Sequence, residues 1–144
     1  MLRTHLTRAI VLVALLAGIA TGGALAAADN SVSIGPSTVP VSPNGYRFAI
    51  NVTCGPSPTA TPCNGQLSMR TLVIKPYRSL PKRWWPVGLR PFSIPAGKTA
   101  PVPHRLLAGA LVQLKLTGRV RVLVTIYRDG SVVGTKLLTL RLKR

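Results

Sequence analysis

The sequence predicts an all-β protein, an antiparallel β-sandwich of about seven short strands in one domain. Apolar and polar residues alternate with a period of two in several segments, as they do in strands with one buried face. The chain has 13 glycines and 13 prolines in 144 residues, and these interrupt it at short intervals, as turns between strands do. Only segment 106–116 carries leucines at helical spacing, enough for a turn or two of helix.

The alternation defines each expected strand. Segments 46–54, 67–73, 120–127 and 138–143 alternate clearly, and Asp129-Gly130 between the last two predicts a hairpin turn. Segments 92–94 and 99–102 are expected to form another short pair around Pro95-Ala96-Gly97. Segments 31–34 and 38–41 are expected to form one edge strand that is broken at Gly35-Pro36, because Pro40 suits only an edge position.

Residues 1–26 have the order of regions that is typical of a cleavable secretory signal peptide. Arg3 and Arg8 precede an apolar run over 9–20, and small residues ending in Ala24-Leu25-Ala26 follow it. The alternative is an uncleaved anchor, since 9–28 is just long enough to cross a bilayer. We expect an N-terminal edge segment over 27–45 and the sandwich domain over 46–144.

Export would place the protein outside the cytoplasm, either secreted or associated with the cell envelope. In that compartment Cys54 and Cys63, the two cysteines of the chain, are expected to form a disulfide. A loop this short restricts the unfolded chain by about 2.5–3 kcal/mol in the entropy model.

The charge is strongly basic, with 19 Lys and Arg against 2 Asp and Glu and a formal net charge of +17. Only Arg3 and Arg8 would leave with the signal peptide, so 19 minus 2, or 17, basic residues remain against Asp29 and Asp129. The charge therefore belongs to the mature domain. Such a balance favours an anionic partner.

One basic group lies in a segment where the composition changes sharply, between Lys75 and Pro91. Pro76, Pro81 and Pro86 are expected to keep this segment out of regular structure. An exposed loop of this kind can stack on sugar rings or bases, or lie in a lipid headgroup layer. Alternatively, one tryptophan closes the end of the sandwich and the bases form a solvated rim. The candidate binding residues are Lys75, Tyr77, Arg78, Lys82, Arg83, Trp84, Trp85 and Arg90.

A second basic group occupies alternate positions of the last hairpin. If its strands pair, these cations share one outer face of a sheet and need counterions or an anionic partner. Alternatively, the charge keeps the domain soluble and protects an edge strand. The residues are Arg119, Arg121, Arg141 and Lys143.

The residue inventory argues against catalysis. His104 is the one histidine after residue 5 and lies in an expected loop, while Asp29 and Asp129 are far apart in the sequence. With the cysteines paired, these residues do not assemble a zinc or copper site, a catalytic triad or a carboxylate pair. We expect no enzyme activity, no metal and no cofactor.

Several short motifs occur in a suggestive order. A cysteine closes one strand, Cys63-x-Gly65-x-Leu67 opens the next, and Phe92-x-Ile94-x-Ala96-Gly97-Lys98-Thr99 and Gly118-Arg119-Val120-Arg121-Val122 follow. Over about 46–144 this order resembles the immunoglobulin-like β-sandwich modules of secreted and cell-surface proteins of actinobacteria. The chain departs from them in lacking acidic residues to balance its bases, and in the insert-like segment 75–91. The resemblance implies a stalk, adhesion or binding unit.

These observations together predict a non-enzymatic extracytoplasmic domain that binds at the cell envelope or at another anionic surface. Its partner would be an anionic envelope polymer or a membrane surface, whereas a nucleic acid is not expected outside the cell. One alternative is a protein-interaction module that docks through the Trp84/Trp85 loop. Another is a cationic membrane-active protein. The sequence does not define the oligomeric state.

Overall fold

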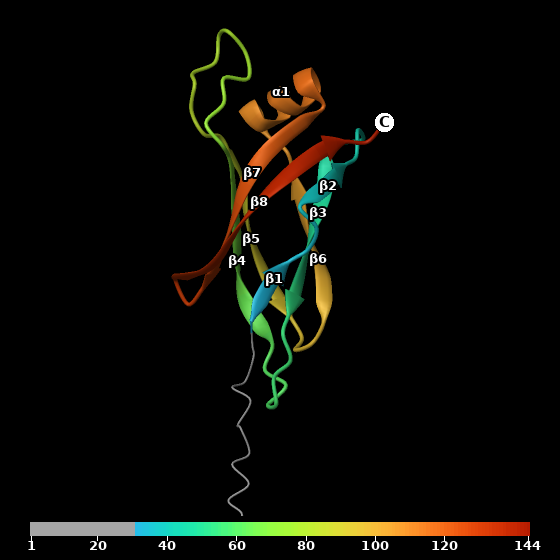
Figure 1. The fold of residues 1–144 in the computed structure, drawn as a ribbon, viewed down its shortest axis with the longest axis vertical. Coiled ribbons are helices and arrows are strands. Elements are labelled where there is room, and N and C mark those ends of the chain that lie inside the picture. The colour runs from blue at the N-terminus through green and yellow to red at the C-terminus, as the bar shows by residue number, and fades with distance from the viewer. Residues whose placement is uncertain (1–30) are drawn as a thin grey trace, which may run out of the picture.

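The computed structural model describes residues 31–144, which form two β-sheets and one helix (Figure 1). One sheet has three strands in the order β1-β3-β6, and the other has five in the order β2-β8-β7-β4-β5. The elements are β1 Val32–Ile34, β2 Thr38–Val41, β3 Arg47–Cys54, β4 Cys63–Thr71, β5 Pro86–Ile94, β6 Thr99–Arg105, α1 Ala108–Thr117, β7 Arg119–Arg128 and β8 Ser131–Leu142. The expected signal peptide lies outside the described residues. No helix within 31–144 is long and apolar enough to cross a membrane.

The predicted alternation places the core between the sheets. In β3, Phe48, Ile50 and Val52 are buried, and the residues between them face outward or are half-buried. β7 likewise buries Val120, Val122, Val124 and Ile126. Fully burying one such aliphatic side chain stabilises the fold by about 1.5–3 kcal/mol. The all-β class and the two sheets follow directly from this pattern.

The first expected strand breaks at Gly35-Pro36 as predicted, but its two halves join different sheets. β1 pairs antiparallel with β3, and after the break β2 pairs parallel with β8. The Lys136 ammonium group donates hydrogen bonds to the carbonyl oxygens of Ile34 and Gly35, and so ties the crossing point to β8. The prediction of a wholly antiparallel sandwich of about seven strands was therefore wrong at this edge, and residues 31–144 contain eight strands.

The expected pairing of 92–94 with 99–102 was also wrong. β5 pairs with β4 in the larger sheet, whereas β6 pairs with β3 in the smaller one. Turn 95–98 carries the chain from one sheet to the other, and the Cys54 amide donates to the Lys98 carbonyl oxygen at 2.9 Å. A short turn between two strands therefore led here to a change of sheet instead of a hairpin.

The helix and the segment before β5 also differ from expectation. α1 has ten residues, nearly three turns, because burial of Ala110 and Leu114 in the core supports a longer helix than its isolated sequence would hold. It ends at Gly118, whose φ of +72° suits glycine and whose amide donates to the Leu114 carbonyl oxygen at 2.8 Å. Pro86 and Pro91 lie within β5, so only 72–85 remains outside the named strands.

Four strands form the edges of the two sheets, and prolines occupy three of them. β2 contains Pro40, β5 contains Pro86 and Pro91, and β6 contains Pro101 and Pro103; the fourth, β1, has only three residues. In β6 the prolines lack the N–H groups that would face the open edge. Short or proline-bearing edges resist pairing with another chain.

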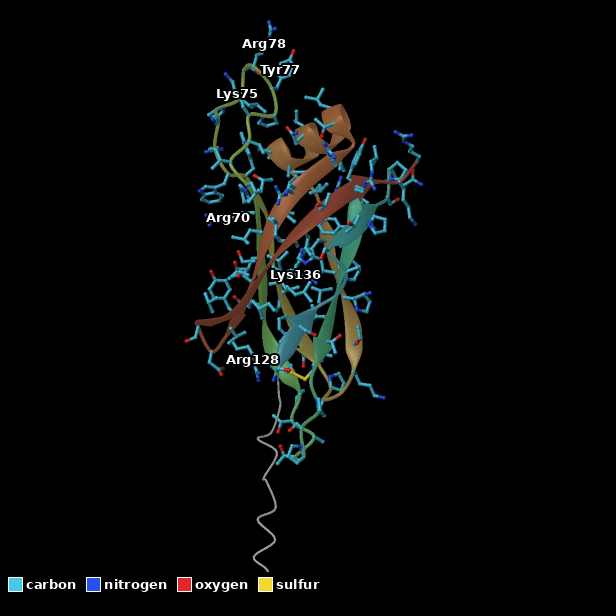
Figure 2. All side chains as sticks on the ribbon, viewed as in Figure 1. Arg70, Lys75, Tyr77, Arg78, Arg128 and Lys136 are labelled. Atoms are coloured by element: carbon cyan, nitrogen blue, oxygen red, sulfur yellow. A yellow bond between two sulfur atoms is a disulfide. The ribbon has the colours of Figure 1, made fainter. Side chains whose placement is uncertain are left out.

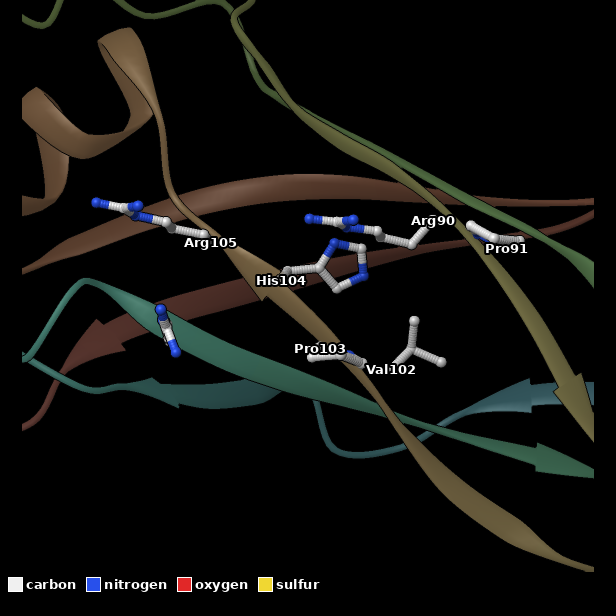
Figure 3. Close-up of a pocket in the computed structure, with 7 residues that line it drawn as sticks. Arg90, Pro91, Val102, Pro103, His104 and Arg105 are labelled. Atoms are coloured by element: carbon white, nitrogen blue, oxygen red, sulfur yellow. The ribbon is translucent and has the colours of Figure 1, made fainter.

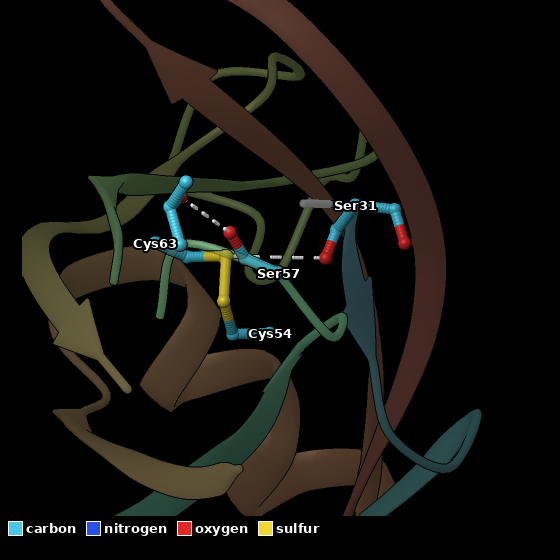
Figure 4. Close-up of a disulfide and its surroundings, with 5 residues drawn as sticks. Ser31, Cys54, Ser57 and Cys63 are labelled. Carbon is cyan, nitrogen blue, oxygen red and sulfur yellow. Dashed lines mark hydrogen bonds between the residues drawn. A yellow bond between two sulfur atoms is a disulfide. The ribbon is translucent and has the colours of Figure 1, made fainter. Parts of the chain in front are cut away.

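The predicted disulfide is present and links the end of β3 to the start of β4 (Figure 4). The Cys54 and Cys63 side chains are fully buried. The Gly55 amide donates to the Ser31 carbonyl oxygen at 2.7 Å, which holds the start of the described chain beside the bridge. A disulfide of this kind is typical of proteins outside the cytoplasm.

Candidate functional site

The 72–85 loop stands on a hydrogen-bonded stem that continues β4 and β5. The Thr71 amide donates to the Trp85 carbonyl oxygen at 2.8 Å, and the amides of Ile74 and Arg83 each donate to the other's carbonyl oxygen at 3.0 and 3.1 Å. Beyond this stem the loop projects past the sheets next to α1 (Figure 1). The loop is therefore a structured protrusion rather than an irregular insert.

Trp85 attaches this protrusion to the helix. Its side chain is 6% exposed, and a Cβ added to Gly109 would lie 2.3 Å from the indole ring, so the ring packs directly on the backbone of α1. The Arg83 guanidinium carbon lies 4.2 Å from the ring centroid. This arrangement corresponds to the alternative in which one tryptophan closes the end of the sandwich, and Trp85 is not available on the surface.

Other aromatic side chains of the loop face outward. Trp84 is 49% exposed and Tyr77 is 57% exposed. The Arg70 guanidinium carbon lies 5.5 Å from the Trp84 ring centroid, within cation–π distance. Figure 2 shows Lys75, Tyr77 and Arg78 at the tip of the loop. The exposed cations of the loop are Lys75, Arg78, Lys82 and Arg83.

The hairpin cations share one outer face, as their spacing predicted. Arg119 and Arg141 lie directly opposite each other in the β7–β8 pairing, and Arg121 lies opposite Thr139. These arginines and Lys143 are exposed, whereas Val120 and Leu140 face the core. Like charges directly opposite each other destabilise a sheet, so an anion bound here would relieve the repulsion.

The base of the loop and the last hairpin meet at a groove that the sequence did not reveal, and two of the predicted cations, Arg119 and Arg121, line it. The groove has a volume of about 510 Å³ and is bounded by the loop, α1 and the last hairpin. The Leu72 amide donates to the Arg121 carbonyl oxygen at 3.3 Å, joining the loop stem to β7. We call the combined set the cationic surface. It consists of Lys75, Arg78, Lys82, Arg83, Arg119, Arg121, Arg141 and Lys143.

Two predicted residues lie elsewhere, and one cation that was not predicted, Arg70, lies beside the loop. Trp85 is in the core, and Arg90 lies on β5 in a different cleft, beside His104. Arg70 contacts Trp84, and Lys115 lies on α1 with its ammonium group 4.9 Å from the Tyr46 ring centroid. The period of two in β4 was sufficient to place Arg70 on an outer face, but not to place it beside the loop.

The cationic surface lies far from any acidic side chain among residues 31–144. Asp129, the single one, occupies the turn at the opposite end of β7 from Arg119. A ten-residue strand separates these positions, which corresponds to about 30 Å at about 3.3 Å per residue. This distance exceeds the Debye length of about 8 Å at physiological salt, so Asp129 does not neutralise the surface.

Residues 31–144 contain no group of three His, Cys, Asp or Glu side chains that could hold a metal ion. The polar groups of the cationic surface are guanidinium and ammonium groups. Guanidinium groups form paired hydrogen bonds to phosphate or carboxylate oxygens, and ammonium groups act as point charges. The groups on this surface are therefore chemically suited to pair with anions.

Comparisons with known proteins give no family for this chain. No family model and no curated protein matches it. The β-glucosidase DesR from Streptomyces venezuelae superposes with a TM-score of 0.45 at 10% identity, over 76% of this chain and 15% of that chain. The ligand binding region of Serine-glutamate repeat protein A from Enterococcus faecium gives a TM-score of 0.41 at 12% identity, over 79% of this chain and 98% of that chain. A β-glucosidase from Listeria innocua gives a TM-score of 0.40 at 13% identity, over 78% of this chain and 16% of that chain. Likenesses of this size carry no argument about function.

Proposed function

We propose that this protein is a non-enzymatic, extracytoplasmic binding module of immunoglobulin-like topology, and that it binds an anionic surface of the cell envelope through its cationic surface. The observation that carries the proposal is the number of exposed bases on the loop and on the adjoining end of the last hairpin, where Arg119 and Arg121 line the groove between them, with the single acidic side chain of 31–144 at the far end of β7. A surface of one charge sign raises the local concentration of oppositely charged partners and speeds their association.

The strand order supports the immunoglobulin-like part of this proposal. In immunoglobulin domains, strands A, B and E share one sheet and strands C, F and G share the other. Taken in chain order, β1, β3 and β6 correspond to the first set, and β4, β7 and β8 to the second, with β7 central. The disulfide departs from that family, because it joins β3 to β4 within one connection rather than the B and F positions.

The location rests on two observations of different kinds. The order of charged, apolar and small residues in 1–26 is typical of a signal peptide. The buried disulfide between Cys54 and Cys63 is typical of an oxidising compartment. Fusion of residues 1–30 to a reporter enzyme that is active only outside the cytoplasm tests this part, and an inactive fusion would contradict it.

Co-sedimentation tests the binding itself. The purified protein is mixed at low salt with vesicles of phosphatidylglycerol, with neutral phosphatidylcholine vesicles, or with polyphosphate-coated beads. We expect retention on the two anionic supports alone, with a loss of roughly tenfold or more on raising salt from about 50 to 200 mM. Equal retention on phosphatidylcholine, or retention that salt does not change, would contradict the proposal.

A protein partner is the second candidate, favoured by the exposure of Trp84 and Tyr77. Aromatic side chains are enriched among the residues that dominate protein interfaces. Under this alternative, Trp84→Ala removes binding to a partner at every salt concentration, whereas charge removal at Arg119 and Arg121 changes little. Under the proposed function, Trp84→Ala changes binding little at low salt, whereas charge removal at Arg119 and Arg121 weakens it.

A further inference from the structure

A separate cleft opens between β5 and β6, the neighbouring edge strands of the two sheets. It has a volume of about 450 Å³, within the range of about 300–1,000 Å³ typical of small-molecule sites. Figure 3 shows the Arg90 guanidinium group beside the His104 ring, whereas the Arg105 side chain extends away from that ring. The cleft is lined by Arg47, Arg90, Pro91, Val102, Pro103, His104 and Arg105. The sequence had singled out only Arg90 among these residues.

Three arginines reach this cleft from three strands. Arg47 and Arg105 lie opposite each other in the β3–β6 pairing, and Arg90 comes from β5 in the other sheet. All three are exposed, and no lining residue carries a carboxylate. Positive charges that line one cleft without a counter-charge repel one another, so an oxyanion bound to these arginines would lower the energy of the arrangement.

His104 forms part of the cleft wall and does not add to its charge. Its side chain is 4% exposed, its ring stacks on Phe48 with centroids 5.5 Å apart, and its Nε2 has no hydrogen-bond partner. Burial, together with the positive charge of Arg90, lowers the pKa of His104 to about 4. The imidazole is therefore neutral at neutral pH, and the positive charge of the cleft comes from the arginines.

The backbone around the cleft does not favour a peptide strand as the occupant. A strand added to the edge of β6 would need N–H donors there. The Gly35 amide donates to the Asn51 carbonyl oxygen at 2.8 Å, so Asn51 directs its backbone groups toward β1. The partners of Asn51 and Ala49 across the sheet are Pro101 and Pro103, whose nitrogens face the open edge and carry no hydrogen. The guanidinium groups are thus the principal donors at this edge.

We propose that the cleft between β5 and β6 binds a compact oxyanionic group, a phosphate or a carboxylate, carried on a body of about monosaccharide size. Paired guanidinium hydrogen bonds would hold the oxyanion, and Pro91, Val102 and Pro103 would contact the attached body. This site is separate from the cationic surface. It recognises one anionic group by geometry, whereas the cationic surface responds to charge density.

Titration of the ¹⁵N-labelled full chain by NMR tests the proposal. The probes are glycerol 1-phosphate and galacturonate, with glycerol and galactose as uncharged controls. We expect saturable shifts of the guanidinium signals of Arg47, Arg90 and Arg105 with at least one charged probe. The probe that binds more tightly identifies phosphate or carboxylate as the preferred group. The absence of saturable shifts with both charged probes, up to about 10 mM, would overturn the proposal, since that concentration saturates a site with a Kd of about 1 mM.

Charge-preserving variants separate recognition by geometry from simple attraction. Arg90→Lys and Arg105→Lys keep the charge but lose the planar donor pair, and we expect each to weaken binding by roughly tenfold. Arg144→Lys, outside both sites, is the matched control and should bind the probe like the unchanged protein. Equal binding by Arg90→Lys and Arg105→Lys, or an equal loss in Arg144→Lys, would contradict the proposed site. All three side chains are exposed, and unchanged amide spectra would establish that the variants are folded.

Discussion

At the residue scale, the two adjacent tryptophans have different environments. Trp85 is buried against α1 and attaches the loop, whereas Trp84 is half exposed beside Arg70. The sequence could not distinguish them, because the distinction depends on the close approach of Gly109, a residue from a segment that lies well beyond the loop in the chain. A glycine in a short leucine-rich helix gave no indication that a ring would pack on it.

Gly109→Ala is expected to destabilise the fold by about 1–3 kcal/mol, because the added methyl group would overlap the Trp85 ring. Alanine is the better helix former by about 1 kcal/mol, so a measured loss would reflect packing alone. Urea denaturation monitored by tryptophan fluorescence measures the free energy of unfolding. Gly134→Ala is the matched control, since its Cβ would meet Ile126 at an ordinary 3.6 Å. Equal stabilities of the two variants would contradict this packing.

His104 is expected to make stability depend on pH. Its pKa is about 4 in the folded protein against 6.5 in the unfolded chain, so between these values only the unfolded state takes up the proton. The stability that the neutral His104 side chain contributes to the fold is fully present above pH 6.5 and is lost as the pH falls to about 4. The free energy of unfolding should decrease by up to about 3 kcal/mol over this range.

His104→Phe provides the comparison for this pH dependence. His104 is the one histidine of residues 31–144, and phenylalanine can keep the stacking on Phe48 without titrating. Urea denaturation at several pH values should give a much flatter profile for the variant between pH 6.5 and 4. The same slope in both proteins would show that another group is responsible.

At the element scale, periodicity predicted strands well and their partners poorly. The alternation of β3, β7 and β8 placed their buried faces correctly, because one face of each strand meets the core. The pairing of β2 with β8 and the separation of β5 from β6 depend on where the chain crosses between sheets. Such crossings are decided by long-range packing, and neither Gly35-Pro36 nor 95–98 carries a local signal for them.

The same limit applies to the candidate sites. Spacing was enough to predict that Arg119, Arg121 and Arg141 share a face. The groove between Arg119, Arg121 and the base of the 72–85 loop, and the cleft that Arg47, Arg90 and Arg105 line from two sheets, require the tertiary structure. In both cases the lining residues belong to segments that are distant in the chain.

The prolines of β6 are expected to prevent association through its open edge. Pro101→Thr/Pro103→Thr restores two N–H donors there, and we expect association that increases with protein concentration. Sedimentation velocity over a range of concentrations measures this effect. Pro58→Thr/Pro62→Thr in the 55–62 loop is the matched control and should leave the sedimentation unchanged. A β6 variant that sediments like the control would contradict the role given to these prolines.

At the scale of the whole molecule, the charge is distributed unevenly along the sandwich. The loop, the start of β7 and the end of β8 carry the cationic surface, whereas Asp129 occupies the far turn of the same hairpin. A domain that needed charge only for solubility would have no reason to place so many of its bases on the loop and the adjoining end of one hairpin. Under the proposed function, the uneven distribution favours a defined orientation on an anionic surface, with the loop and α1 toward it.

Under the proposed function, the position of the positive charges on the molecule, and not the net charge, determines binding. Arg121→Gln on the cationic surface and Lys98→Gln in the turn between β5 and β6 each remove one positive charge. The most direct measurement is the affinity of each variant for phosphatidylglycerol vesicles across a series of salt concentrations. We expect Arg121→Gln to bind more weakly, with a shallower dependence of log affinity on log salt, and Lys98→Gln to match the unchanged protein. Equal losses in the two variants would show that net charge alone attracts the protein, and would contradict the account.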